Sequence, residues 1–168
     1  MAKQKTLDDL FLDTLKDIYY AEKKILKALP KMKRAASNEK LAQAFEKHRE
    51  ETEEQIERLQ QVFEILGKSA RGKTCEAIEG IISEGEEIME EFKGTPALDA
   101  GLISAAQAVE HYEIARYGTL CRWAKELGMK DAEKLLKQTL DQESKTDADL
   151  TKLAEKTVND AAKASEPA

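Results

Sequence analysis

The sequence predicts an all-α protein in which four long helices form one bundle. Charged residues make up 36% of the 168 residues and aromatic residues only 5%, and helix-forming Glu, Lys, Leu, Ala and Gln dominate. Apolar residues recur every three or four positions through most of the chain, which is the spacing of one helix face. Glycine and proline stand mainly between these periodic segments, where helices end.

The first half of the chain is typical of a helical hairpin. The first predicted helix spans 7–36, and Pro30 lies inside its apolar pattern, so the helix should bend or break there. The second predicted helix spans 39–66 and is ended by Gly67. A tight turn between the two makes them antiparallel.

The second half begins with a different kind of segment. A polar loop precedes a shorter helix over 75–92, which Thr74 can cap. A second hairpin follows, with helices over 97–127 and 130–156 separated by Gly128.

The lengths of the connections predict the topology. The connection between the hairpins has about 30 residues, enough to travel the whole bundle, so the helices over 39–66 and 97–127 run parallel. We therefore expect the up-down-down-up arrangement of ferritin-like four-helix bundles, with an extra helix in the one long crossover. This domain is predicted to span 1–157, followed by a flexible tail over 158–168.

Charge and hydropathy exclude several classes of function. The net charge is −6 and the pI about 5.2, with no long basic run, which argues against nucleic-acid binding. No apolar run approaches the roughly 20 residues of a membrane span, and no signal peptide is visible. Cys75 and Cys121 have no metal-ligand spacing, and two free thiols suit a reducing cytoplasm.

Every long helix interrupts its apolar face with polar side chains near its middle. Glu110 and Glu113 occupy two positions where the 3–4 spacing of their helix predicts core residues. Side chains three or four residues apart lie on one helix face, one turn apart. The interrupting residues that we take as candidate metal ligands are Glu22, His48, Glu51, Glu110, Glu113, Glu143 and Asp147.

These interruptions are predicted to fall at one level of the bundle. If each hairpin turns at the centre of its connection, Glu22 lies beside Glu51 and Glu113 lies level with Glu143. Burying even one unpaired carboxylate costs several kcal/mol, and six would threaten a net stability on the order of 5–15 kcal/mol. No lysine or arginine stands on these stripes, so we expect two metal ions to neutralise the acids, and this ligand chemistry suits iron or manganese.

Each candidate also has a plainer interpretation. A glutamate at a core position can lie at the edge of the stripe and reach water, and His48 alone can be a hydrogen-bonded core histidine. Because two divalent ions balance only four carboxylates, one or two of the six acids would be protonated or would support the ligands instead. Further candidates for a supporting role are Thr52, Gln55, His111 and Tyr117.

Five stretches of the chain carry a family resemblance. They are YYAEK (19–23), SNEKLAQAFEKHREET (37–52), CEAIEG (75–80), AAQAVEHYEIARYGTL (105–120) and KLLKQTLDQESKTDADLT (134–151). With them the chain resembles the YciF-type bacterial stress proteins of the ferritin-like superfamily over about 7–155. The resemblance implies a homodimer, a dinuclear metal centre related to that of rubrerythrin, induction under stress in the cytoplasm, and no firmly assigned reaction.

The resemblance also implies roles for individual residues. Glu51 and Glu143 match bridging carboxylates, Glu22 matches the carboxylate of the first helix, and Glu110 and Glu113 match the pair of the third. The usual di-iron pattern has a histidine three residues after the glutamate on two helices.

This chain departs from that pattern. Glu54 and Thr146 stand at the two histidine positions, and His48 precedes its glutamate by three residues. A site so rich in carboxylates could prefer manganese or hold iron weakly.

Three hypotheses remain open at this point. The first is an oxidoreductase in which two irons react with peroxide or dioxygen. The second is a non-enzymatic helical-bundle stress protein or partner-binding module without a functional metal site. The third, a manganese enzyme similar to manganese catalase, differs from the first only in metal and substrate. The catalytic residues, substrate and reductant cannot be read from the sequence.

Overall fold

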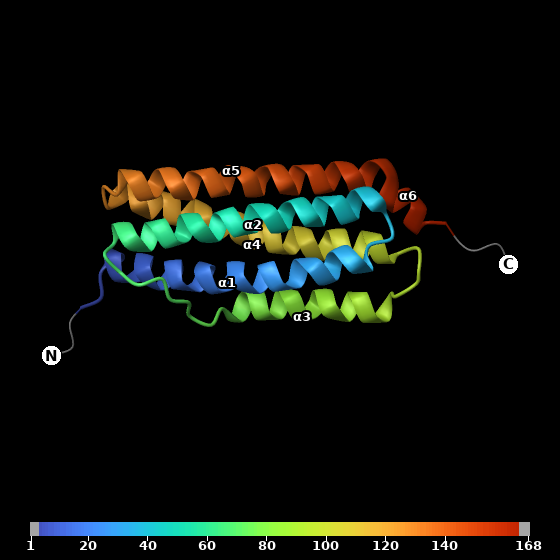
Figure 1. Cartoon of the computed structure of the whole chain (residues 1–168), viewed down its shortest axis with the longest axis horizontal. Helices are drawn as coiled ribbons and strands as arrows, with labels where there is room; N and C mark the ends of the chain where they lie inside the picture. Colours follow the sequence, from blue (N-terminus) through green and yellow to red (C-terminus); the bar gives the residue numbers. More distant parts are fainter. Residues whose placement is uncertain (1–3, 165–168) are drawn as a thin grey trace.

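The computed structural model describes residues 4–164, and this part of the chain forms helices and no strand (Figure 1). The elements are α1 (Leu7–Ala35), α2 (Glu39–Ile65), α3 (Glu76–Glu91), α4 (Leu98–Glu126), α5 (Lys130–Leu153), a π-helical turn η1 (Ala154–Val158) and α6 (Asn159–Ala162). The first four helices, α1 to α4, each start and end within one residue of the predicted bounds.

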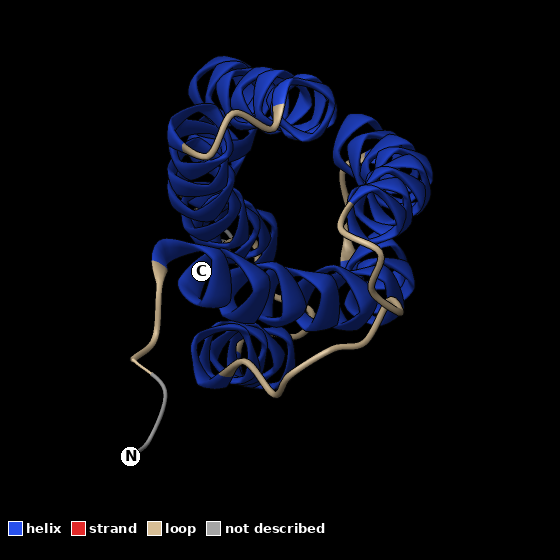
Figure 2. Ribbon diagram, turned by 90° about the vertical axis from the view of Figure 1, so that its left-hand side faces the viewer, coloured by secondary structure: helices blue, strands red, loops and turns tan. Residues whose placement is uncertain are grey.

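The topology is the predicted up-down-down-up bundle. In Figure 1, α1 and α5 run in one direction along the bundle and α2 and α4 run in the other. Figure 2 shows the four long helices around a common axis, with α3 outside them. The crossover helix α3 packs against α1 and α4 as it carries the chain from one end of the bundle to the other. None of the described helices is long and apolar enough to span a membrane.

Local sequence explains most helix ends. The side chain of Asn38 caps α2 by accepting a hydrogen bond of 3.1 Å from the backbone N–H of Leu41. Gly67 and Gly128 end α2 and α4 with φ angles of +64° and +71°, which glycine adopts without steric cost. Pro30 does not break α1, which continues to Ala35.

The cap of α3 corrects a prediction. The N-cap is Cys75 and not Thr74, and the Cys75 Sγ accepts a hydrogen bond of 3.4 Å from the backbone N–H of Ile78. Buried Cys75 takes this place because α3 starts one residue later than predicted.

The predicted start of the flexible tail at residue 158 is also too early. The helical conformation continues through η1 and α6 to Ala162, and Val158 is buried against the core. The apolar contact of Val158 explains why the chain stays helical past the end of α5. Residues 165–168, the last part of the predicted tail, lie outside the described residues.

The apolar core is divided by a polar layer. On α1, buried Ile18 and Ile25 lie one turn before and one turn after buried Glu22. On α4, Ala106 and Tyr117 flank Glu110 and Glu113 in the same way. The polar side chains that the core buries are Glu22, His48, Thr52, Gln55, Glu110, Glu113, Thr139 and Glu143.

Candidate metal centre

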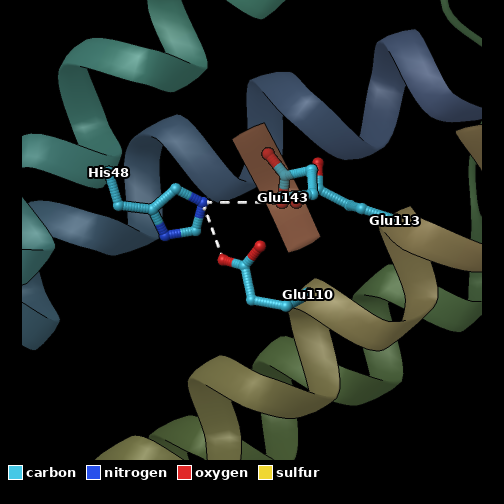
Figure 3. Close-up of side chains that lie close together, drawn as sticks. All are labelled: His48, Glu110, Glu113 and Glu143. Carbon is cyan, nitrogen blue, oxygen red and sulfur yellow. Dashed lines mark ion pairs between the residues drawn. The ribbon is translucent and has the colours of Figure 1, made fainter. Parts of the chain in front are cut away.

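Four side chains meet at the centre of the bundle. His48 on α2, Glu110 and Glu113 on α4 and Glu143 on α5 each present one potential ligand atom, and these atoms all lie within 4.8 Å of one another. Figure 3 shows the four side chains gathered between their helices. All four are buried, so the bundle holds a carboxylate–histidine cluster away from water.

The histidine lies between two of the acids. His48 Nε2 is 2.9 Å from Glu110 Oε1 and 4.0 Å from Glu143 Oε2 (Figure 3). Gln55 donates a hydrogen bond from Nε2 to Glu143 Oε1, which fixes the carboxylate from the neighbouring helix. Thr52 instead donates to the backbone carbonyl of His48 at 2.7 Å, so it acts on the helix that carries the histidine.

Glu22 extends the cluster to α1. Its side chain is fully buried, and its Oε1 accepts a hydrogen bond of 2.6 Å from the Tyr117 hydroxyl. Glu22 also interacts with the side chain of Glu113, and the negative charge of Glu143 acts to raise the pKa of Glu22. All four long helices therefore contribute to one polar layer, as the spacing along the sequence predicted.

The cluster contains many buried polar atoms that have no hydrogen-bond partner. Among the described residues, every buried side-chain atom of this kind belongs to this layer. The atoms are Glu22 Oε2, His48 Nε2, Gln55 Oε1, both carboxylate oxygens of Glu110 and of Glu113, and Glu143 Oε2. Leaving one such group unpaired costs about 1–3 kcal/mol, so a folded protein has to compensate for them. Bound metal ions would do so, because carboxylate oxygens and an imidazole nitrogen are the ligands of iron and manganese.

Burial changes the acidity of the cluster. It raises the pKa of Glu22 to about 8, with repulsion from Glu143 adding to the effect. Burial and the neighbouring Glu143 raise the pKa values of Glu110 and Glu113 well above their ordinary range. Burial also lowers the pKa of His48, since the charged imidazolium loses its hydration.

Glu143 behaves differently from the other acids. Burial acts to raise its pKa, but the neighbouring side chains of Glu110 and Glu113, the nearby imidazole and the hydrogen bond from Gln55 favour its ionised form, so its pKa is lowered. Without metal, burial therefore favours the protonated forms of Glu22, Glu110 and Glu113, and the contacts of Glu143 favour its ionised form. A metal ion bound to these carboxylates would compete with their protons and release them.

Two predicted ligands lie at the edge of the layer. Glu51 is 17% exposed, pairs with Lys47 at 3.5 Å and accepts a hydrogen bond of 3.2 Å from the Thr146 hydroxyl. Asp147 is 21% exposed and pairs at 3.1 Å with His111, which is itself 69% exposed. Both acids have partners of their own, and neither belongs to the group of four.

One cation close to the cluster was not predicted from the sequence. Arg58 lies three residues after Gln55 on α2, and its Nη1 donates to Gln142 Oε1 at 2.5 Å and to Thr139 Oγ1 at 3.2 Å. Its charge favours ionised Glu22 and so opposes the increase in that pKa. The i, i+3 spacing from Gln55 was the signal that could have revealed it.

Fold and site together define a class of protein: a four-helix bundle whose core encloses a carboxylate–histidine cluster that could hold metal. The chain belongs to the DUF892 family, described as a domain of unknown function, whose sequence profile matches residues 6–163. The family resemblance inferred from the sequence is thereby confirmed.

Similar proteins have the same fold. The chain is 51% identical to the protein YciF of Escherichia coli over 156 residues, which cover 92% of this chain and 94% of that protein. The crystal structure of the E. coli stress protein YciF matches with a TM-score of 0.88 and 50% identity, covering 93% and 99% of the two chains. YcfI of Rhodopseudomonas palustris matches with a TM-score of 0.86 and 48% identity, covering 90% and 97%.

Proposed function

We propose that this protein is a bacterial stress-response protein whose bundle holds a dinuclear carboxylate site, with iron as the metal. Its function would be redox chemistry with peroxide or dioxygen, or the handling of iron. The observation that carries this proposal is the set of buried, unpartnered ligand atoms on His48, Glu110, Glu113 and Glu143. The name of the E. coli relative supports the stress-related role.

In this proposal the candidate ligands would divide between two metal ions. His48, Glu110 and Glu143 would hold one ion, because their ligand atoms already converge. Glu22 and Glu113 lie together on the α1 side of the layer and would hold the second. Glu51 would join Glu143 as a ligand, as the family resemblance implies, once Glu51 left Lys47 and Thr146.

Two reduced irons would supply two electrons, which with two protons convert dioxygen to hydrogen peroxide, or hydrogen peroxide to two waters. The chain would supply what this chemistry needs. The cluster releases protons when metal binds, since Glu22, Glu110 and Glu113 have raised pKa values. Tyr117 holds Glu22 in place. Apolar layers on both sides exclude bulk water from the cluster.

Anaerobic titration with ferrous iron followed by mixing with an oxidant tests the proposal. We expect saturation near two irons per chain and rapid oxidation of the bound iron by peroxide or dioxygen. Glu143→Gln should abolish both, while Asp149→Asn, a surface change on the same helix, should leave both unchanged. Oxidation in both variants at the rate of free ferrous iron would contradict the proposal.

A specific observation favours a second candidate, a non-enzymatic bundle or partner-binding module. The carboxyl groups of Glu110, Glu113 and Glu143 present oxygens within 4.8 Å of one another in the buried layer, so these acids can share protons among themselves. Such a protein needs no metal. Glu143→Ala would then stabilise the protein, because it removes a buried charge. Measuring which metal the purified protein contains also distinguishes the iron oxidoreductase from the third hypothesis, a manganese enzyme similar to manganese catalase.

We further propose a cytoplasmic homodimer. Cys75 and Cys121 are free, which fits a reducing compartment. Light scattering coupled to gel filtration tests the dimer.

A further inference from the structure

A pocket between α1, α3 and α4 extends from the surface to His48. At the outer end lie Lys31 and Glu86, an exposed ion pair of 3.1 Å. At the inner end lies the buried His48, which belongs to the cluster described above. The pocket therefore leads from solvent-exposed residues toward the candidate metal centre. The crossover helix α3 covers this side of the bundle (Figure 1).

The walls of the pocket are mainly apolar, and the pocket itself is small. Between the ion pair and the histidine, the lining consists of apolar residues, among them Ala28, Ile82, Gly85, Ala105 and Val109. Its volume is about 30 Å³. That is room for roughly one or two molecules of the size of water, and too little for an organic substrate.

Glycine at position 85 keeps this space open. Gly85 is buried in the middle of α3, where glycine is less favourable than alanine because its backbone loses more conformational freedom in a helix. A Cβ atom added there would lie 3.4 Å from the Cβ of Ala105, so a side chain would enter the space between α3 and α4. Gly80 on the same helix faces open space and does not line the pocket.

We propose that this pocket binds an apolar diatomic gas, dioxygen, and admits it to the His48 face of the cluster. Because the walls offer few polar groups, a hydrogen-bonding molecule such as hydrogen peroxide would lose its hydration there without replacement, which is unfavourable. Dioxygen loses almost none. The use of the pocket rests on the proposed function, while the binding of a gas in it does not require metal.

Xenon is a probe for the binding step, since apolar cavities take it up. Crystals of the metal-free protein under xenon pressure should show xenon between Gly85, Ala105 and His48. The signal should be lost in Ala28→Leu, reduced in Gly85→Ala and kept in Gly80→Ala. Melting temperatures identify any variant that fails to fold. Absence of xenon from the pocket of the unaltered protein would overturn the proposal.

Oxidation kinetics test the passage to the cluster. In iron-loaded protein, Ala28→Leu should slow oxidation by dioxygen several-fold and leave oxidation by hydrogen peroxide unchanged, and Gly80→Ala should change neither. An unchanged dioxygen rate in Ala28→Leu would rule out the pocket as the route. If the protein binds no iron, the proposed function fails, and the xenon experiment still decides whether the pocket binds a gas.

Discussion

Tyr117 donates a hydrogen bond of 2.6 Å to Glu22 and thereby joins α4 to α1 at the polar layer. Both side chains are fully buried. The other oxygen of Glu22 has no hydrogen-bond partner, so this hydroxyl is the direct contact that holds the carboxylate in place.

Tyr117→Phe should destabilise the metal-free protein by about 1–3 kcal/mol, because it leaves a buried carboxylate oxygen unpaired. It should also raise the pKa of Glu22 further, since the hydroxyl favours the ionised form. Urea denaturation at several pH values measures both effects. Tyr112→Phe is the matched control, because the Tyr112 hydroxyl bonds to part-exposed Asp17 outside the cluster. An equal loss of stability in Tyr117→Phe and Tyr112→Phe would contradict a special role for Tyr117.

The stability of the metal-free protein should fall as pH rises from 6.5 to above 8. The folded cluster retains protons that the unfolded chain has released above its ordinary glutamate pKa of 4.5, since the pKa of Glu22 is raised to about 8 and those of Glu110 and Glu113 are raised as well. Stability from a raised pKa is lost as pH rises toward the folded value.

The lowered pKa of His48 acts in the opposite sense, but only below about 6.5, its ordinary value. The lowered pKa of Glu143 matters only below about 4.5. Above pH 6.5, each carboxyl group with a raised pKa can therefore lower the free energy of unfolding by up to about 1.4 kcal/mol per pH unit. Thermal unfolding in the presence of a chelator checks the slope, and a stability that rises over this window would contradict the burial of these acids.

Glu113→Gln should stabilise the metal-free protein at pH 8 and weaken metal binding. Glutamine keeps the shape of the side chain and removes an acid whose ionisation burial opposes. Denaturation of the metal-free variant measures the first effect, and isothermal titration with manganese measures the second. Asp147→Asn, at the exposed edge, serves as the comparison and should leave metal affinity nearly unchanged. Loss of affinity in Asp147→Asn alone would move the site toward His111.

Metal should raise the melting temperature. At a free metal concentration 100 times the dissociation constant, binding to the folded state adds about 2.7 kcal/mol of stability. For a chain of this size that corresponds to roughly 5–10 °C. Calorimetry with and without chelator measures the shift, and a melting temperature that chelation leaves unaltered would favour the non-enzymatic bundle.

The fold could be predicted from the sequence because helix periodicity and connection length are local properties. The common direction of α2 and α4 followed from the length of the crossover alone. The predicted helical region ended too early near the C-terminus, where Val158 makes a tertiary contact that periodicity does not reveal. The position of α3 against α1 and α4, and with it the pocket, also depends on packing and could not be predicted.

The site was predictable as a level in the bundle but not as a set of contacts. Spacing placed Glu22, Glu113 and Glu143 at one height, and these three side chains do interact. Spacing could not distinguish them from Glu51 and Asp147, which lie at the same height but turn toward the surface. A difference of a fraction of a helical turn decides between the two groups, and it depends on how the helices rotate when they pack.

The most direct test is the metal content of protein purified without added chelator, compared with a Glu51→Ala/Glu143→Ala double variant. The proposal predicts about two iron or manganese ions per chain and their loss in the double variant. Glu51→Ala alone should keep one ion if Glu51 only bridges, because His48, Glu110 and Glu143 converge without it. No metal in the unaltered protein, even after reconstitution with ferrous iron under nitrogen, would contradict the metal centre and leave a polar layer of shared protons.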